Sequence, residues 1–251
     1  MKLTLLLTAL LTLAYAAGAS AQIFDNPQNL KVLPDDISAA ELGKTMKSFA
    51  LGTGFRCSSC HMGEEGQPLS EYDFSSDEKE LKQTARRMLK MVRDINGNHL
   101  EFRGDDRIEV QCITCHRGVN KPEMTADVLS GAVAHGGVEG LQTAYRELRG
   151  RYYGTHSYDF SDFTLGSFTQ SLMREGKTDE ARAMLDMVLE DNPASFNAVF
   201  LYGELSVQEG NTQAAEEYYL QAIELNPRAA AFIQPKLEEL KSPKAEGSDA
   251  S

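Results

Sequence analysis

Cys57-Ser58-Ser59-Cys60-His61 and Cys112-Ile113-Thr114-Cys115-His116 are two copies of one five-residue pattern, C-x-x-C-H. Together they use all four cysteines of the chain. This pattern is typical of covalent attachment of a c-type haem. Two thiols separated by two residues can bond to the two vinyl groups on one edge of a porphyrin, and the adjacent histidine can bind the iron. The sequence therefore predicts two covalently bound haem c groups.

Three other uses of paired cysteines compete with this interpretation. An exported chain could form two disulfides, but a disulfide does not explain why a histidine follows each second cysteine. A redox-active C-x-x-C pair normally belongs to a thioredoxin-like βαβ unit, and the sequence predicts none. A zinc ribbon usually separates its cysteine pairs by roughly 15–20 residues, whereas 51 residues lie between Cys60 and Cys112. Haem attachment explains the histidines and the spacing together.

Each haem iron in an electron carrier needs a second axial ligand, which is usually methionine or histidine. A helix is predicted before the first motif, where a capping box at 38–41 opens an apolar stripe. Gly52 and Gly54 are expected to end this helix and to let the chain turn into Cys57. Met46 lies in the middle of the stripe, 11 residues before Cys57. It is therefore a candidate ligand.

A second helix is predicted before the second motif, with a capping-box pattern at 75–78 and a break at Asn96-Gly97. Met88 is more central than Met91 on its apolar stripe, although spacing alone leaves ordinary core packing equally open. The stripe comprises Leu81, Ala85, Met88, Val92 and Ile95. The loop 98–111 is expected to hold at most a short hairpin. Other candidate distal ligands are His99, which is nearby, and the more remote His135 and His156.

Residues 29–120 resemble the haem-binding half of the cytochrome c subunit of photosynthetic reaction centres. The matching stretches are Leu30-Lys31-Val32-Leu33, Lys44-Thr45-Met46, Thr84-Ala85-Arg86-Arg87-Met88-Leu89-Lys90-Met91, Ile95-Asn96 and Cys112-Ile113-Thr114-Cys115-His116-Arg117-Gly118. In that family, a methionine on the helix before each C-x-x-C-H motif is the distal ligand. The resemblance implies that Met46 pairs with His61 on the first haem. It likewise implies that Met88 pairs with His116 on the second.

The resemblance also has limits that bear on function. The reaction-centre subunit carries four haems, whereas this chain has two motifs. In the family, a histidine in the loop before the second motif binds one of the additional haems. This neighbourhood has Phe102 instead, and His99 lies a few residues away. The chain therefore resembles a two-haem relative that carries electrons without light chemistry.

The C-terminal half repeats itself every 34 residues, which is the tetratricopeptide period. The repeated positions are Gly176 and Gly210, Ala181 and Ala215, and Asn192-Pro193 and Asn226-Pro227. The predicted apolar faces comprise Leu165, Phe168, Leu172, Ala181, Leu185 and Val188, then Val199, Tyr202, Gly203, Ala215, Tyr219 and Ala222. A helix over 138–149 is expected before these units, and a closing helix over 229–240 contains Pro235. Because three units are usually needed for stability, the module is expected to pack on the cytochrome domain or on another chain.

The N-terminus reads as a Sec-type signal peptide over 1–21, because Lys2 precedes an apolar run and a small-residue cleavage site. A dihaem cytochrome c domain is then expected over 22–125 and a linker with a helix over 126–160. Two tetratricopeptide-like repeats with a capping helix are expected over 161–240, and a disordered tail over 241–251. We expect a periplasmic or otherwise exported protein with no transmembrane segment in the mature chain.

Charge is unevenly spread along the chain. The formal net charge is −12; residues 22–120 carry 16 acids and 13 bases, and residues 121–251 carry 21 acids and 11 bases. The acidic surface argues against nucleic acid and against an anionic membrane as partners. Other redox proteins are the expected partners, and the repeats could also mediate self-association.

Taken together, the patterns predict a mainly α fold, with a multihaem c-type cytochrome domain followed by an α-helical repeat module. The predicted function is electron transfer between redox proteins, without enzymatic activity. Two other classes remain open. A dihaem peroxidase would need one haem with an open distal site, and a redox-sensing adaptor would rely mainly on its repeats.

Overall fold

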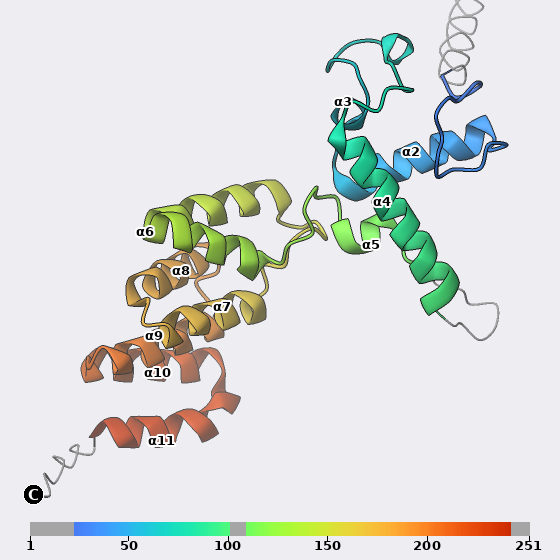
Figure 1. Ribbon diagram of the computed structural model, residues 1–251. Coiled ribbons are helices and arrows are strands. Elements are labelled where there is room, and N and C mark those ends of the chain that lie inside the picture. The colour runs from blue at the N-terminus through green and yellow to red at the C-terminus, as the bar shows by residue number, and fades with distance from the viewer. Residues whose placement is uncertain (1–22, 101–108, 242–251) are drawn as a thin grey trace, which may run out of the picture. The chain divides into compact units, whose positions relative to one another are not determined.

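A computed structural model describes residues 23–100 and 109–241 of the chain (Figure 1). The chain divides into two compact units, Met1–Pro122 and Glu123–Ser251. The expected signal peptide, nearly all of the expected tail and most of the loop with a possible hairpin lie outside the described residues. The described part is built from helices and contains no β-strand, which confirms the prediction of a mainly α fold.

The first unit consists of short helical segments around the two cysteine motifs. Helix α2 packs on α5, and helix α3 packs on α4. The cysteines of the first motif open and close α3, whereas α5 contains all of the second motif. The segments are α2 (Ala39–Thr53), α3 (Cys57–Cys60), the 3-10 turn η1 (Leu69–Glu71), α4 (Glu80–Asp94), the π-helical turn η2 (Ile95–His99) and α5 (Cys112–His116).

Helix α2 begins and ends with recognisable caps. The Glu41 backbone N–H donates to Ser38 Oγ and the Ser38 N–H donates to Glu41 Oε2, each at 3.2 Å, which confirms the predicted capping box. Gly54 ends the helix with φ 71°, a conformation that favours glycine. Gly52, which was also expected to end the helix, instead lies buried inside it. It allows close packing, because a Cβ at Gly52 would lie 2.8 Å from Cys112 Cβ.

Helix α4 begins at Glu80, so the prediction of a capped start at 75–78 is wrong. Asp73 Oδ1 accepts hydrogen bonds from the backbone N–H groups of Ser75 and Ser76, at 2.8 and 3.0 Å. These bonds hold the two serines in a turn. The carbonyls of this turn face Lys82 instead of starting the helix.

The second unit contains helices that pack in antiparallel pairs (Figure 1). Gly137 has φ 53° and ψ −137° and divides the first of these helices into two limbs. The limbs approach closely, because a Cβ at Gly140 would lie 2.5 Å from the carbonyl oxygen of Ala132. The helices are α6 (Thr125–Tyr152), α7 (Asp162–Arg174), α8 (Thr178–Asp191), α9 (Phe196–Gln208), α10 (Thr212–Leu225), η3 (Pro227–Ala229) and α11 (Ala230–Lys241).

The segment 126–160, which was predicted as a linker, belongs to this second unit. Leu129, Val133, Leu141 and Tyr145 of α6 lie in one apolar cluster with residues of α7, α8 and α9. The two limbs of α6 thus add a third helical pair to the two predicted repeats. The second limb confirms the helix predicted over 138–149, whereas the first limb was not predicted, because its turn is a single glycine and its spacing departs from 34 residues.

The predicted repeat faces form the core of the second unit. All twelve residues named for those faces are buried, which confirms that part of the prediction. Gly176 and Gly210 have φ 73° and 76°, so the turn between the two helices of each repeat uses the same left-handed glycine. The closing helix α11 contains Pro235 as predicted.

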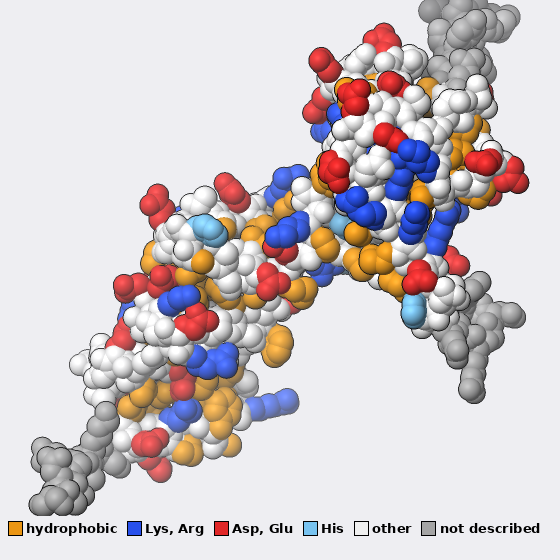
Figure 2. Space-filling view, viewed as in Figure 1, with side chains coloured by type: hydrophobic (Ala, Val, Ile, Leu, Met, Phe, Trp, Pro, Cys, Tyr) orange, Lys and Arg blue, Asp and Glu red, His pale blue; other side chains and the backbone are white. Residues whose placement is uncertain are grey.

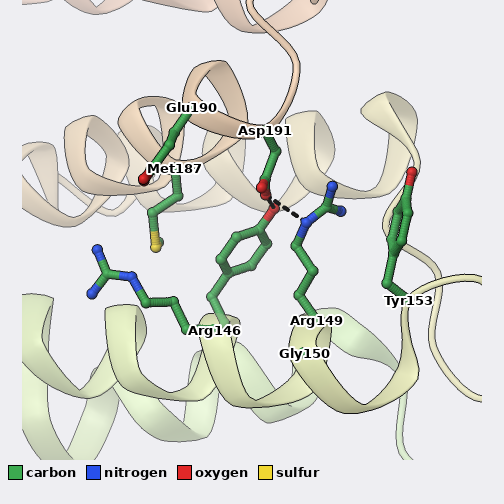
Figure 3. A pocket seen from close by; sticks show the side chains of 8 residues that line it. Arg146, Arg149, Gly150, Tyr153, Met187, Glu190 and Asp191 are labelled. Carbon is green, nitrogen blue, oxygen red and sulfur yellow. Dashed lines mark hydrogen bonds and ion pairs between the residues drawn. The ribbon is translucent and has the colours of Figure 1, made fainter.

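A hollow of about 430 Å³ lies between α6 and α8 (Figure 3). The Tyr145 hydroxyl donates to Asp191 Oδ2 at 2.6 Å, and Arg149 Nε pairs with the same oxygen at 2.6 Å. Burial, together with this carboxylate, raises the pKa of Tyr145. These contacts stabilise the packing of α6 on α8. The hollow has no cysteine or histidine in its lining.

In residues 23–100 and 109–241, no helix is both long enough and apolar enough to cross a membrane.

Candidate haem sites

All four cysteines are described, and each is a free thiol. In the first motif, the His61 backbone N–H donates to the Cys57 carbonyl at 2.9 Å, which closes the single turn of α3. Burial raises the pKa of the Cys60 thiol. No disulfide joins the cysteines, so the structure does not follow the disulfide interpretation of the motifs.

His61 is enclosed by the loop that follows the first motif. Its ring lies edge-on to Phe74, with the centroids 4.9 Å apart. Its Nδ1 atom is buried and makes no hydrogen bond. Burial, assisted by the Lys82 ammonium, lowers the pKa of His61 to about 4, against a smaller opposing effect of the Phe74 backbone. The imidazole is therefore neutral at physiological pH, which is the form that binds a metal.

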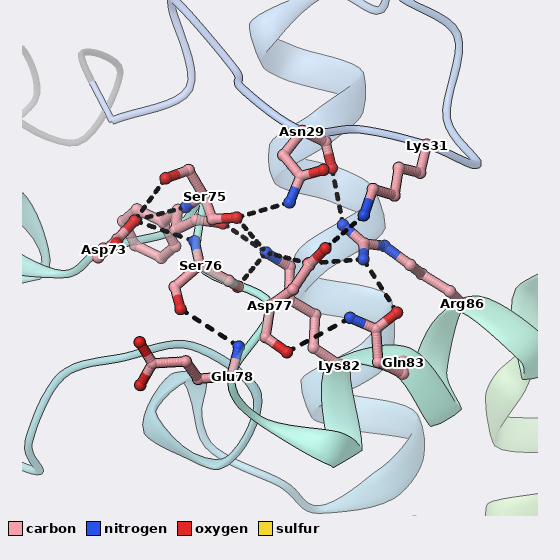
Figure 4. A network of polar contacts seen from close by, with 11 residues as sticks. Asn29, Lys31, Asp73, Ser75, Ser76, Asp77, Glu78, Lys82, Gln83 and Arg86 are labelled. Carbon is pink, nitrogen blue, oxygen red and sulfur yellow. Dashed lines mark hydrogen bonds and ion pairs between the residues drawn. The ribbon is translucent and has the colours of Figure 1, made fainter.

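A buried lysine holds the loop around Phe74 in place (Figure 4). Lys82 is 8% exposed, and its Nζ donates to the carbonyls of Phe74 at 2.8 Å, Ser75 at 3.2 Å and Ser76 at 2.6 Å. These three acceptors compensate for the burial of the ammonium group. Lys82 thus fixes the segment that packs against His61.

Asp77 is shared by several cations in the same network (Figure 4). It pairs with Lys31, with Arg86 at 2.6 Å and with Lys82 at 3.5 Å. The hydrogen bond from Lys31 is the main reason why the pKa of Asp77 lies well below its usual range. Arg86 also donates to the Asn29 carbonyl at 2.7 Å. The network therefore ties the N-terminal segment to α4.

The second motif is held by side-chain hydrogen bonds on both sides of α5. Upstream, Asn96 Nδ2 donates to the Val110 carbonyl and the Val110 N–H donates to Asn96 Oδ1, each at 2.8 Å. Downstream, Nδ1 of His116 lies 3.0 Å from the Val119 carbonyl. A bond to a carbonyl requires the proton on Nδ1, so Nε2 presents its lone pair to a metal.

The contact between α2 and α5 fixes which side of α2 faces the second motif. Gly52 lies against Cys112, and Ser48, one turn earlier, is near enough to lower the pKa of the same cysteine against the larger effect of burial. Met46 precedes Ser48 by two residues, which places it about 160° around the helix. Met46 is partly buried and lies away from the α5 contact. This placement is compatible with the expected pairing of Met46 with His61.

Met88 lies on the side of α4 opposite the polar network. Lys82 and Arg86 face that network, and Met88 follows Arg86 by two residues, about 160° around the helix. Met88 is 39% exposed and Met91 is 46% exposed. Both thioethers are thus available on one apolar side, and the choice of Met88 continues to rest on the resemblance.

The alternative histidines have other surroundings. His99 pairs with Asp94 at 3.1 Å and is exposed. The two remote histidines lie in the second unit, where His135 Nδ1 contacts the Gly131 carbonyl at 2.7 Å and His156 is exposed. Across the described residues, no three His, Cys, Asp or Glu side chains converge as metal ligands. The structure therefore gives no support to a zinc site formed by both cysteine pairs.

The donor set fits a haem at each motif. Each motif offers two free thiols next to a histidine. One of these histidines is held neutral by its surroundings, and the other is oriented by a carbonyl. Each motif also follows a helix that carries a thioether side chain. Bound haem supplies a one-electron couple, while the protein supplies the attachment and the axial ligands.

Comparison with known proteins assigns the family. The family model described as the photosynthetic reaction centre cytochrome C subunit matches residues 10–165. The chain belongs to this family. A tetratricopeptide repeat model matches residues 170–230, as the 34-residue period predicts. The fusion of a reaction-centre-type cytochrome to helical repeats is therefore confirmed.

A curated relative supports the same assignment. The chain is 33% identical over 106 residues to cytochrome c-554 of Chloroflexus aurantiacus. The aligned residues cover 40% of this chain and 23% of the length of that relative. Together with the family match, this similarity makes the chain a c-type cytochrome, a family that implies covalently bound haem c.

Proposed function

We propose that the chain is an exported, periplasmic carrier that binds two haem groups and moves electrons between redox proteins. The observation that supports this proposal is the occurrence of two complete C-x-x-C-H motifs, each with free thiols and a positioned histidine. Export is supported by the signal-like segment 1–21. It also suits c-type haem, which is attached outside the cytoplasm.

The proposed attachment and ligand sets follow from the motifs. Cys57 and Cys60 hold the first haem, with His61 and Met46 as axial ligands. The second haem is held by Cys112 and Cys115, and its axial ligands are His116 and Met88. With both axial positions filled, each site exchanges electrons without binding a substrate, and Met ligation favours a high reduction potential. The repeat unit is proposed to dock a redox partner or a second copy.

The ligand sets can be tested with carbon monoxide, which binds ferrous haem at an open axial position. The wild-type protein should bind none, whereas Met46→Ala and Met88→Ala should each create one site that binds carbon monoxide. Met91→Ala and His99→Ala are matched controls and should leave the spectrum unchanged. Carbon monoxide binding or peroxide turnover by the wild-type protein would contradict the carrier proposal and favour an enzyme.

A further inference from the structure

The two axial histidines differ in what their Nδ1 atoms contact. His116 Nδ1 donates to the Val119 carbonyl at 3.0 Å. His61 Nδ1 is buried and makes no hydrogen bond. The Phe74 backbone, which also acts on His61, has its carbonyl shared with Lys82, whose Nζ donates to it at 2.8 Å. The His116 ring is thus polarised by a carbonyl acceptor, whereas the carbonyl next to His61 is shared with a cation.

Cations lie close enough to His61 to act on its ring. The charged side chains with the largest effects on that ring are Lys82, Arg86 and Lys79. Lys82 has the largest effect of the three and is almost fully buried, so solvent screens it weakly. The carboxylate nearest to it, Asp77, lies at 3.5 Å and is shared with two other cations.

The hydrogen bond at His116 and the cation beside His61 act on the difference between the two reduction potentials in the same direction. An imidazole that donates to a carbonyl is a more basic ligand, which stabilises the oxidised metal and lowers the potential. A buried cation near the other site disfavours the additional positive charge of the oxidised state and raises the potential. The His61 site is therefore expected to hold an electron more strongly than the His116 site.

We propose that Lys82 is a positioning residue that sets the His61 site at a higher potential than the His116 site, so that electrons pass from the second motif to the first. This inference rests on the proposed function, because it needs a haem at each motif. One electron leaves the His116 site, which is oxidised, and enters the His61 site, which is reduced. No bond forms or breaks in this transfer. An electron donor would then dock nearer the second motif and an acceptor nearer the first.

Assignment of the two potentials tests the order without changing Lys82. Replacing an axial methionine by histidine lowers the potential of that haem. In potentiometric titrations of the haem-loaded full chain, Met46→His should lower the higher of the two midpoints and Met88→His the lower one. The opposite assignment would overturn the proposal while leaving a two-haem carrier intact. A protein with fewer than two haems, or without a shift in either variant, would overturn the proposed function itself.

Variants of Lys82 test the role of its charge. Lys82→Met should lower the higher midpoint and reduce the equilibrium constant for electron exchange between the two sites at least tenfold, which corresponds to about 59 mV for one electron. Lys82→Arg keeps the charge and should restore most of the difference. Lys177→Met removes one exposed cation from the second unit and controls for net charge. An unchanged higher midpoint in Lys82→Met, with both haems still six-coordinate, would contradict the role of Lys82.

Discussion

The two units of the chain bury apolar surface in very different amounts. Among the described residues, the first unit buries only two hydrophobic side chains, Leu42 and Val119, whereas the second buries 24. The first unit also exposes apolar side chains on α4 and α5, including Leu81, Met88 and Ile113. In the space-filling view, hydrophobic and basic side chains lie next to one another on its surface (Figure 2). The second unit thus has a core made of its own side chains, whereas the first leaves apolar side chains that a bound haem could cover.

The difference shows how each unit is stabilised. Burial of apolar surface is the main favourable contribution to folding, at roughly 25 cal/mol per Å². The stacked repeats meet this need through contacts between neighbouring helices. The cytochrome unit instead has a polar network around the buried Lys82 and the partly exposed Asp77, and its apolar surface is available to porphyrin.

Preventing haem attachment should cause the largest loss of structure, and this loss should be confined to the first unit. A variant with serine at Cys57, Cys60, Cys112 and Cys115 should lose hydrogen-exchange protection throughout the first unit, because that unit buries little apolar surface of its own. The second unit should keep the protection that it has in the haem-loaded protein. Hydrogen exchange with peptide-level mass spectrometry distinguishes the two units. Persistent protection of α2 and α4 in this variant would contradict the contrast between the units.

A large cavity in the repeat core should destabilise the second unit and leave the first unit unchanged. Leu205 is fully buried, so Leu205→Ala should reduce the unfolding free energy of the second unit by about 2–5 kcal/mol. The haem spectrum should not change. Urea unfolding followed by far-ultraviolet circular dichroism measures this loss, and Val207→Ala on the exposed side of the same helix is the matched control. An equal loss in both variants would show that burial is not the cause.

Two glycines of the second unit should respond in opposite directions to alanine. A Cβ at Gly203 would lie 2.6 Å from the ring of the buried Tyr219, so Gly203→Ala should cost about 1–3 kcal/mol. Gly150 lies in α6 with no atom within 4 Å of its would-be Cβ. Gly150→Ala should therefore stabilise the unit by about 0.5–1 kcal/mol. Thermal unfolding of both variants measures the pair, and the same sign in both would contradict the close-packing argument.

The smallest expected effect concerns the start of α7 and depends on pH. The hydrogen bond from Thr164 is the main reason why the pKa of Asp159 lies below the usual value of 3.8. The carboxylate also accepts from the Ser161 N–H at 2.8 Å. Because the folded state favours the ionised form, this contribution exists above the usual pKa and fades as the pH falls through the lowered one.

Asp159→Asn should therefore cost the second unit about 1 kcal/mol at pH 7 and less in acid. Urea unfolding of the variant and the wild type, at pH 7 and in acid, gives the difference in unfolding free energy. A cost that is equal at neutral and acidic pH would show that the charge of Asp159 is not involved.

Much of the second unit could be predicted because its information is local and periodic. The 34-residue spacing fixes Ala181 with Ala215 and Gly176 with Gly210, and the same core positions recur in both repeats. The first limb of α6 could not be found in this way, because it departs from the period. Its membership in the core depends on contacts with α7 and α8 that no local pattern encodes.

At the candidate sites, the sequence identifies the cysteines and histidines that are proposed to hold haem and misses the residues that support them. The C-x-x-C-H spacing is set by porphyrin chemistry, so Cys57 and His61 can be read directly. Lys82 looks like an ordinary solvated lysine until the turn at Ser75 brings three carbonyls around it. Asn96 belongs to a stretch that resembles the family, which marks it as a residue of interest. Its role could not be predicted, because its two hydrogen bonds to Val110 depend on the path of the loop.

The mass of the denatured mature chain is the most direct test of the central claim, because only covalently attached haem survives denaturation. The account predicts a mass increase equal to two haem groups. After proteolysis, one haem should remain on the peptide that contains Cys57 and Cys60, and the other on the peptide that contains Cys112 and Cys115. A chain with one haem or none, after expression with the haem-attachment machinery, would contradict the account.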